Sequence, residues 1–213
     1  MNFNPSNQPP NPTQLPLSAS FDFRSEDEMW DTAYHEAGHI VMSRAVGCFS
    51  LRSATIVPGG GYLGLCVGRD LRLHPGDHAR GILFDMAGFA AEWLRIGEPP
   101  IVWDWVVAGS GAAVDYETAM ASARVLHPRR PERYVRAMTF LAYRTLVHCR
   151  SSVERVAAAL VAEKTIDDWA RLFALAEGSG GRRSRLARLH DRWLAGRGRR
   201  FQIWLAATGG VQG

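Results

Sequence analysis

The run His35-Glu36-Ala37-Gly38-His39 constrains this 213-residue chain more than any other feature. It has the pattern H-E-x-x-H, in which the two histidines are four residues apart. On a helix, side chains at this spacing share one face with Cβ atoms roughly 5–6 Å apart, and two imidazole nitrogens placed in this way can both reach one zinc ion. Glu36 follows the first histidine. It is therefore the candidate general base, which takes a proton from water and does not bind the metal.

The residues within the stretch Trp30–Gly47, and those just before it, favour a helix. Ser25 and Glu28 have the spacing of a capping box, which satisfies free amides at a helix start, and Gly47 is suited to end the helix. Gly38 inside a helix costs about 1 kcal/mol relative to alanine. We therefore expect this small residue to let another segment approach the metal closely.

Composition indicates a single soluble domain. The hydrophobic fraction of 46% and the charged fraction of 22% are typical of globular proteins, and no stretch approaches the roughly 18 apolar residues of a membrane span. The first residues lack the basic start and apolar run of a secretory signal. The cysteines are odd in number and lack C-x-x-C spacing, which predicts free thiols and a cytoplasmic location. They are Cys48, Cys66 and Cys149.

We expect three parts in the chain. Residues 1–24 are rich in Asn and Pro and predict a disordered or loosely attached leader, residues 25–177 predict the folded domain, and residues 178–213 predict a basic tail. From Gly181 to Arg200 there are eight Arg and one Asp. A solvated basic helix is the favoured interpretation of this tail; an acidic protein partner or a membrane surface comes next, and nucleic acid is the least favoured.

The fold class predicted is mainly α-helical with one small β-hairpin near the helix that carries the histidines. The strand candidates 53–57 and 62–67 flank the turn sequence Pro58–Gly61. An exposed strand beside a metal site could hold an extended peptide by backbone pairing. The alternative is a hairpin that only covers the helix, and the two interpretations are compatible.

A further helix is expected from Asp77 to Ile96. The loop 98–111 carries Trp103 and Trp105. Closing the core is the favoured interpretation of these two side chains, and lining a cleft is the alternative. Beyond this loop, signals for helix starts recur four times. They lie near Ala112, at Pro131, at Ser151 or Ser152, and at Thr165 with Asp168.

A catalytic zinc site needs three protein ligands and an open position for water, so a third ligand must come from a distant part of the chain. The metzincin continuation is excluded because Met42 stands where its glycine belongs. A carboxylate must then serve, and spacing alone does not choose among six candidates. These are Asp77, Asp85, Glu92, Asp104, Asp115 and Glu117.

Several segments, taken in order, resemble the peptidase domain of the FtsH-type AAA proteases, which are membrane-anchored ATP-dependent zinc peptidases. Ala33–His39 is similar to the zinc box of that family, and Ala54–Pro58 with Leu63–Gly64 is similar to its strand pair. Ala87–Glu92 is similar to its Gly-Gly-Arg-Ala-Ala-Glu helix. Gly111–Asp115 resembles its Gly-Ala-Ser-Asn-Asp segment. The likeness extends from about residue 28 to residue 175.

The resemblance implies a helical zinc-metallopeptidase domain with one Zn²⁺ per chain. Its ligands would be His35, His39 and Asp115, and Glu36 would be the catalytic base. Glu92 matches a family position that we interpret as structural or as a partner of a ligand. The implied reaction is hydrolysis of peptide bonds in flexible or unfolded protein substrates.

The chain also departs from the family pattern. No G-x-x-x-x-G-K-[ST] occurs, so we expect a peptidase that is ATP-independent by itself and lacks a transmembrane anchor, with a separate ATPase as a possible partner. Phe89 replaces an arginine and Val114 replaces the asparagine before the ligand aspartate. The alternative function is a catalytically silent zinc-binding module that binds an acidic partner or nucleic acid through its basic tail.

Overall fold

The computed structural model describes residues 24–47, 49–59, 61–70, 75–98 and 112–177. The predicted leader, the loop with Trp103 and Trp105, Cys48 and the Arg-rich tail lie outside these ranges. Within them the chain is mainly helical with a small three-stranded antiparallel sheet. The predicted balance of helix and hairpin is therefore confirmed in outline.

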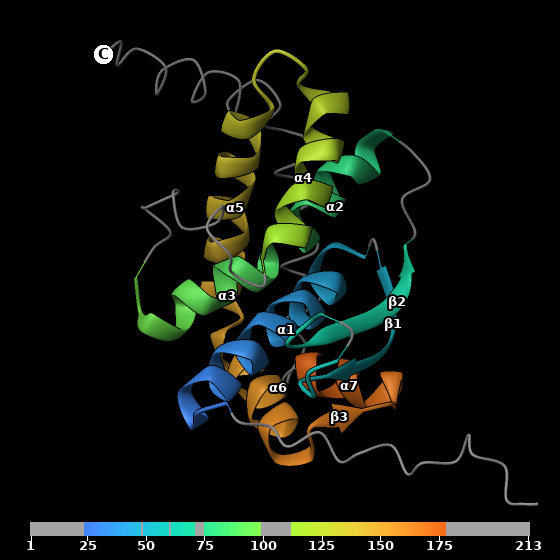
Figure 1. Cartoon of the computed structure of the whole chain (residues 1–213). Coiled ribbons are helices and arrows are strands. Elements are labelled where there is room, and N and C mark those ends of the chain that lie inside the picture. The colour runs from blue at the N-terminus through green and yellow to red at the C-terminus, as the bar shows by residue number, and fades with distance from the viewer. Residues whose placement is uncertain (1–23, 48, 60, 71–74, 99–111, 178–213) are drawn as a thin grey trace, which may run out of the picture.

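Helix α1 (Glu26–Val46) runs through the middle of the molecule, with helices on either side of it and the sheet along one flank (Figure 1). The capping box is present, because the Ser25 side chain accepts from the Glu28 amide while the Glu28 carboxylate accepts from the Ser25 amide. The helix ends at Gly47, whose φ of 68° is the left-handed conformation that glycine adopts without strain. Both predicted ends of this helix are confirmed.

The sheet has the order β2-β1-β3. Strand β1 (Phe49–Thr55) pairs antiparallel with β2 (Leu65–Asp70), and Thr55 lies opposite Leu65. The hairpin is thus where it was predicted, but its strands lie farther from the turn. The predicted strand bounds are wrong because β1 extends back to residue 49 to pair with residues 67–70.

The short strand β3 (Thr165–Ile166) joins the other edge of β1, where it pairs with Ala54 and Thr55. The expected helix cap at Thr165 is wrong. Helix α7 (Trp169–Glu177) is capped by Asp168, whose side chain accepts from the amide of Ala170 at 2.8 Å. A two-residue strand depends on its distant partner and has no periodic pattern of its own.

The single helix predicted for residues 77–96 is wrong, because two helices meet at Met86. They are α2 (Pro75–Asp85) and α3 (Ala87–Ile96). Helix α3 packs on α1, whereas α2 packs mainly on α4 (Ala113–Leu126). One straight helix would not follow both neighbours. The apolar periodicity of residues 77–96 gives no sign of the change of direction at Met86.

Helices α4, α5 (Pro131–His148) and α6 (Arg150–Glu163) complete the domain. Pro131 stands in the first turn of α5, as predicted, where the missing amide of proline has no cost. Side chains of α1, of α2 and α3, and of these three helices form the buried core, and Ile40, Met42 and Met138 are among its fully enclosed side chains. Among the described residues, no helix combines the length and the apolar character needed to cross a membrane.

Candidate metal centre

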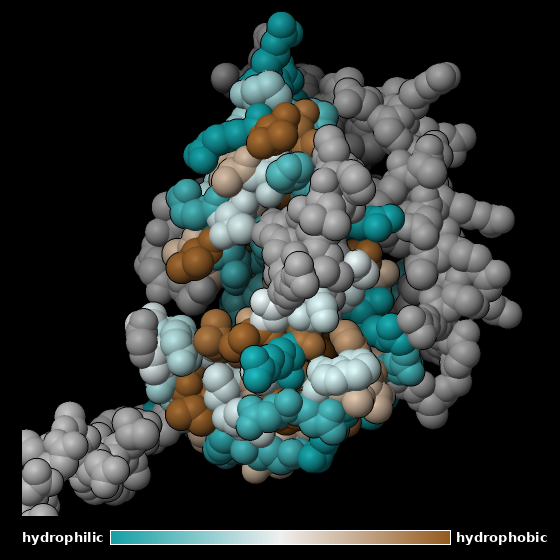
Figure 2. Space-filling model, turned by 90° about the vertical axis from the view of Figure 1, so that its right-hand side faces the viewer, coloured by the Kyte–Doolittle hydropathy of each residue, from teal (hydrophilic) through white to brown (hydrophobic). Residues whose placement is uncertain are grey.

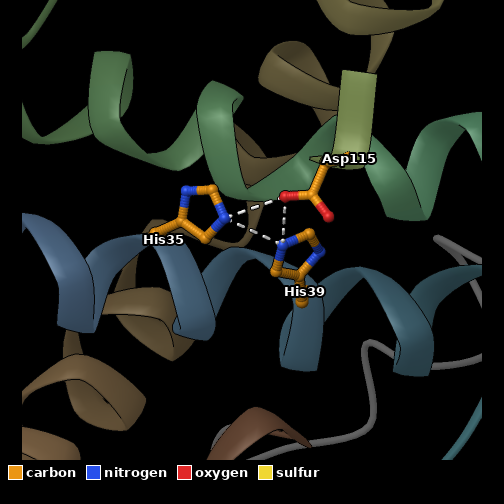
Figure 3. A group of neighbouring side chains, drawn as sticks. All are labelled: His35, His39 and Asp115. Atoms are coloured by element: carbon orange, nitrogen blue, oxygen red, sulfur yellow. Dashed lines mark hydrogen bonds and ion pairs between the residues drawn. The ribbon is translucent and has the colours of Figure 1, made fainter. Parts of the chain in front are cut away.

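Helix α1 places both histidines of the H-E-x-x-H run on its buried face. His35 and His39 lie on successive turns and point toward the first turn of α4, from which Asp115 reaches down between them (Figure 3). His35, Glu36 and His39 are all buried. Asp115 is 80 residues from His35 in the sequence, so this convergence depends on how α4 packs against α2 and its other neighbours.

Three ligand atoms meet at this point. The Nε2 atoms of His35 and His39 are 3.1 Å apart, and Oδ2 of Asp115 lies 3.0 Å from the first and 3.2 Å from the second. Two ligands that bind one ion tetrahedrally at about 2.0–2.1 Å would be about 3.3 Å apart. The separations are close to that spacing. The group of His35, His39 and Asp115 could therefore hold a metal ion.

The outer nitrogens of the two rings are both engaged. Nδ1 of His39 lies 2.9 Å from the carbonyl oxygen of Phe84. A carbonyl only accepts, so this nitrogen carries the proton, and Nε2 of the neutral ring offers a lone pair to the cluster. Nδ1 of His35 donates to Oε1 of Glu92 at 2.6 Å. Partners of this kind orient the imidazole ligands of metal sites and raise their basicity.

The electrostatics of the cluster favour a cation. Burial opposes protonation of His35, but hydrogen bonds to Asp115 and Glu92 outweigh it, and the pKa of His35 is raised well above 6.5. Burial likewise opposes ionisation of Asp115, but the neighbouring His39 and His35 hold the pKa of this carboxyl below its ordinary value. An ionised carboxylate facing two imidazole nitrogens is the donor set that suits zinc.

Glycines allow the surrounding segments to approach these side chains. A Cβ added to Gly88 in α3 would lie 2.4 Å from Nε2 of His35, and one added to Gly38 would lie 2.3 Å from the carbonyl oxygen of Ala87. These spacings are shorter than non-bonded atoms tolerate. The prediction that Gly38 permits a close approach is confirmed, and the segment that approaches is the start of α3.

The base candidate and a thiol lie on the sheet side of the cluster. A Cβ added to Gly64 would be 2.6 Å from Oε1 of Glu36, so the residue just before β2 packs against this carboxylate. The thiol of Cys66 donates to the carbonyl oxygen of Glu36 at 3.6 Å. Burial and the Glu36 carboxylate raise the pKa of Cys66 well above 9.0. The thiol is therefore protonated at neutral pH, and its sulfur does not belong to the group of three converging ligand atoms.

The six carboxylates that remained candidates for the third ligand differ in where they lie in the structure. Asp115 joins the histidines, Glu92 lies behind His35, Glu117 is exposed, and Asp85 is buried in α2. Nothing is described for the side chain of Asp77, and Asp104 lies outside the described residues. Sequence reasoning missed the Phe84 carbonyl, Gly88 and Gly64, because none of these carries a chemical signature of its own.

Comparison with known proteins identifies no family for this chain. No family model matches it, and no curated protein matches it at the significance required.

Glu92 gives a direct test of how the site is built. Replacing Glu92 by Ala should lower the affinity for Zn²⁺ by about 10–100-fold, because His35 loses the partner that fixes its ring. The affinity is measured by competition with a chromogenic chelator. Glu98→Ala is the matched control, since this carboxylate follows α3 and is exposed. An affinity equal in the two variants would remove Glu92 from the site.

Proposed function

We propose that the protein is a zinc-dependent endopeptidase that hydrolyses peptide bonds in flexible or unfolded segments of protein substrates. The observation that supports this most is the convergence of Asp115 on the Nε2 atoms of His35 and His39, with the buried carboxylate of Glu36 on the same helix. The resemblance to the FtsH-type peptidases names the same residues. The proposal does not need an ATPase, although a separate unfoldase could extend the range of substrates.

In this mechanism His35, His39 and Asp115 would hold one Zn²⁺. A zinc ion bound there would activate water and polarise the scissile carbonyl. Glu36 accepts a proton as the water oxygen forms its bond to the carbonyl carbon. Glu36 then delivers this proton to the amide nitrogen as the C–N bond breaks, so that a free amine leaves. The contact with Gly64 limits the positions that the Glu36 carboxylate can take during these steps.

The sheet offers a surface that suits an extended substrate. Strand β2 is at one end of the sheet order, and it starts beside Gly64 and Glu36. Its Leu65 and Val67 are exposed, as are Tyr62 and Leu63 just before it. Figure 2 looks onto this side of the molecule and shows hydrophobic side chains gathered in the lower half of the face. Backbone pairing along such an edge, with apolar side chains beside it, would suit unfolded hydrophobic segments.

Removal of the metal tests the proposal. The purified protein is expected to cleave unfolded casein, to lose this activity with 1,10-phenanthroline, and to recover it when an equimolar amount of Zn²⁺ is returned. Mg²⁺ should not restore cleavage, because two imidazoles and one carboxylate suit zinc and not a hard cation. Cleavage that survives complete removal of metal would contradict the proposal. Zinc binding without any cleavage would favour the silent binding module instead.

A further inference from the structure

One arginine joins both ends of the β1–β2 connection to helix α1. Arg24 stands directly before the cap residue Ser25. Its Nη1 donates to Oγ1 of Thr32 at 3.0 Å and to the carbonyl oxygen of Leu63 at 3.2 Å, and its Nη2 donates to the carbonyl oxygen of Ile56. Ile56 follows the end of β1 and Leu63 lies shortly before β2. A single guanidinium therefore bridges three segments.

The β1–β2 connection also packs against Glu36, the candidate base. Gly64 follows Leu63, and a Cβ added to Gly64 would lie 2.6 Å from Oε1 of Glu36 and 2.7 Å from Cγ2 of Thr32. Thr32 is one helical turn before Glu36, and its hydroxyl accepts from Arg24 while donating to the carbonyl of Glu28 at 2.9 Å. The guanidinium thus holds the residues that pack against the Glu36 carboxylate. None of the bonds described above joins it to that carboxylate or to the metal cluster.

We propose that Arg24 is a positioning residue for Glu36, which holds Leu63 and Gly64 against α1 so that the base carboxylate keeps one place beside the metal cluster. This inference rests on the proposed peptidase function. The effect of Arg24 on Glu36 is indirect, because it is transmitted through Gly64. The same bonds also set where β2 begins, and they therefore set the edge along which a substrate would pair.

Arginine suits this role better than other cations. Its planar guanidinium presents several N–H donors in a fixed arrangement, so it can serve two carbonyls and a hydroxyl together, whereas the ammonium group of lysine is a compact charge on a flexible stem. The capping box adds to this, because it fixes the backbone of Ser25 immediately after Arg24. Without the guanidinium, the carbonyl of the buried Ile56 would lose this donor.

The experiment compares Arg24→Ala and Arg24→Lys with Arg95→Ala in the full chain. Arg95 also binds α1, through Asp27 at 2.8 Å and through Asp31, but no described bond joins it to the β1–β2 connection. For Arg24→Ala we expect kcat to fall by about 10²-fold, the size of loss that a remote change can cause by misplacing a catalytic group. Affinity for Zn²⁺ should stay at the wild-type value. The kcat of Arg24→Lys should lie between that of the wild type and that of Arg24→Ala. Added guanidinium should restore part of the kcat of Arg24→Ala.

A second measurement needs neither metal nor activity. Hydrogen–deuterium exchange of the metal-free protein should be faster across residues 56–66 in Arg24→Ala than in the wild type or in Arg95→Ala. Unchanged exchange there would overturn the inference, and so would a loss of kcat that follows an equal loss of zinc affinity. If the wild-type protein cleaves nothing, the peptidase proposal fails by itself. The exchange experiment then still decides whether Arg24 holds the connection.

Discussion

Glu36→Gln is expected to lower kcat/KM on unfolded casein by about 10²–10⁴-fold, which is the usual contribution of a general base. Glutamine keeps the size and shape of the side chain, and it still fits against Gly64, but it cannot accept the proton from water. The carboxylate of Glu36 does not belong to the group of three converging ligand atoms. Zinc content, measured by mass spectrometry of the metal, should therefore stay at one ion per chain.

The matched control for this change is Glu26→Gln, because Glu26 lies on the same helix and is exposed. This control should cleave casein at the wild-type rate. The separation of activity from metal content is the informative result, since loss of both in Glu36→Gln would indicate that the helix itself had been disturbed. Cleavage by Glu36→Gln at the wild-type rate would end the claim that Glu36 is the base.

Asp115→Ala is expected to lower the affinity for Zn²⁺ by more than the about 10–100-fold that the loss of a ligand's partner costs. Asp115 supplies the only carboxylate oxygen in the group that converges on the two Nε2 atoms in the described part of the chain. Alanine leaves two imidazoles that face each other across 3.1 Å. Two neutral nitrogens with no anionic ligand hold a divalent cation less tightly, and cleavage should be lost together with the metal.

Thermal unfolding gives a readout of this effect that does not depend on activity. At a free concentration about 100 times Kd, a ligand that binds only the folded state stabilises it by about 2.7 kcal/mol. Zn²⁺ should therefore raise the melting temperature of the wild type at concentrations where it leaves that of Asp115→Ala unchanged. Glu117→Ala, which removes an exposed carboxylate from the same helix, should respond to zinc as the wild type does. An equal response of Asp115→Ala would remove Asp115 from the metal site.

Local signals in the sequence were sufficient for helix α1 and its ends. The capping box of Ser25 and Glu28, the left-handed Gly47, and the pair of histidines one turn apart all depend on residues within a few positions of one another. Helical periodicity alone puts His35 and His39 on one face. The break at Met86 and the strand β3 were not predicted, because they follow from which distant element each segment packs against.

The choice of the third ligand likewise depended on more than local sequence signals. Residue spacing left six carboxylates open, and the likeness to a family favoured Asp115, which the packing of α4 brings to 3.0 Å from His35. Glu92 behind His35, the Phe84 carbonyl behind His39, and Gly64 against Glu36 have roles that exist only in the folded chain.

The sequence by itself determined that two imidazoles share one face of a helix that also carries Glu36, because the pitch of a helix brings together side chains four residues apart. Only the tertiary structure decided which distant oxygen joins them, which groups hold the rings, and which backbone lies against Glu36. Those contacts join residues tens of positions apart, and the packing of whole helices and strands sets their distances. No short stretch of sequence encodes such a distance.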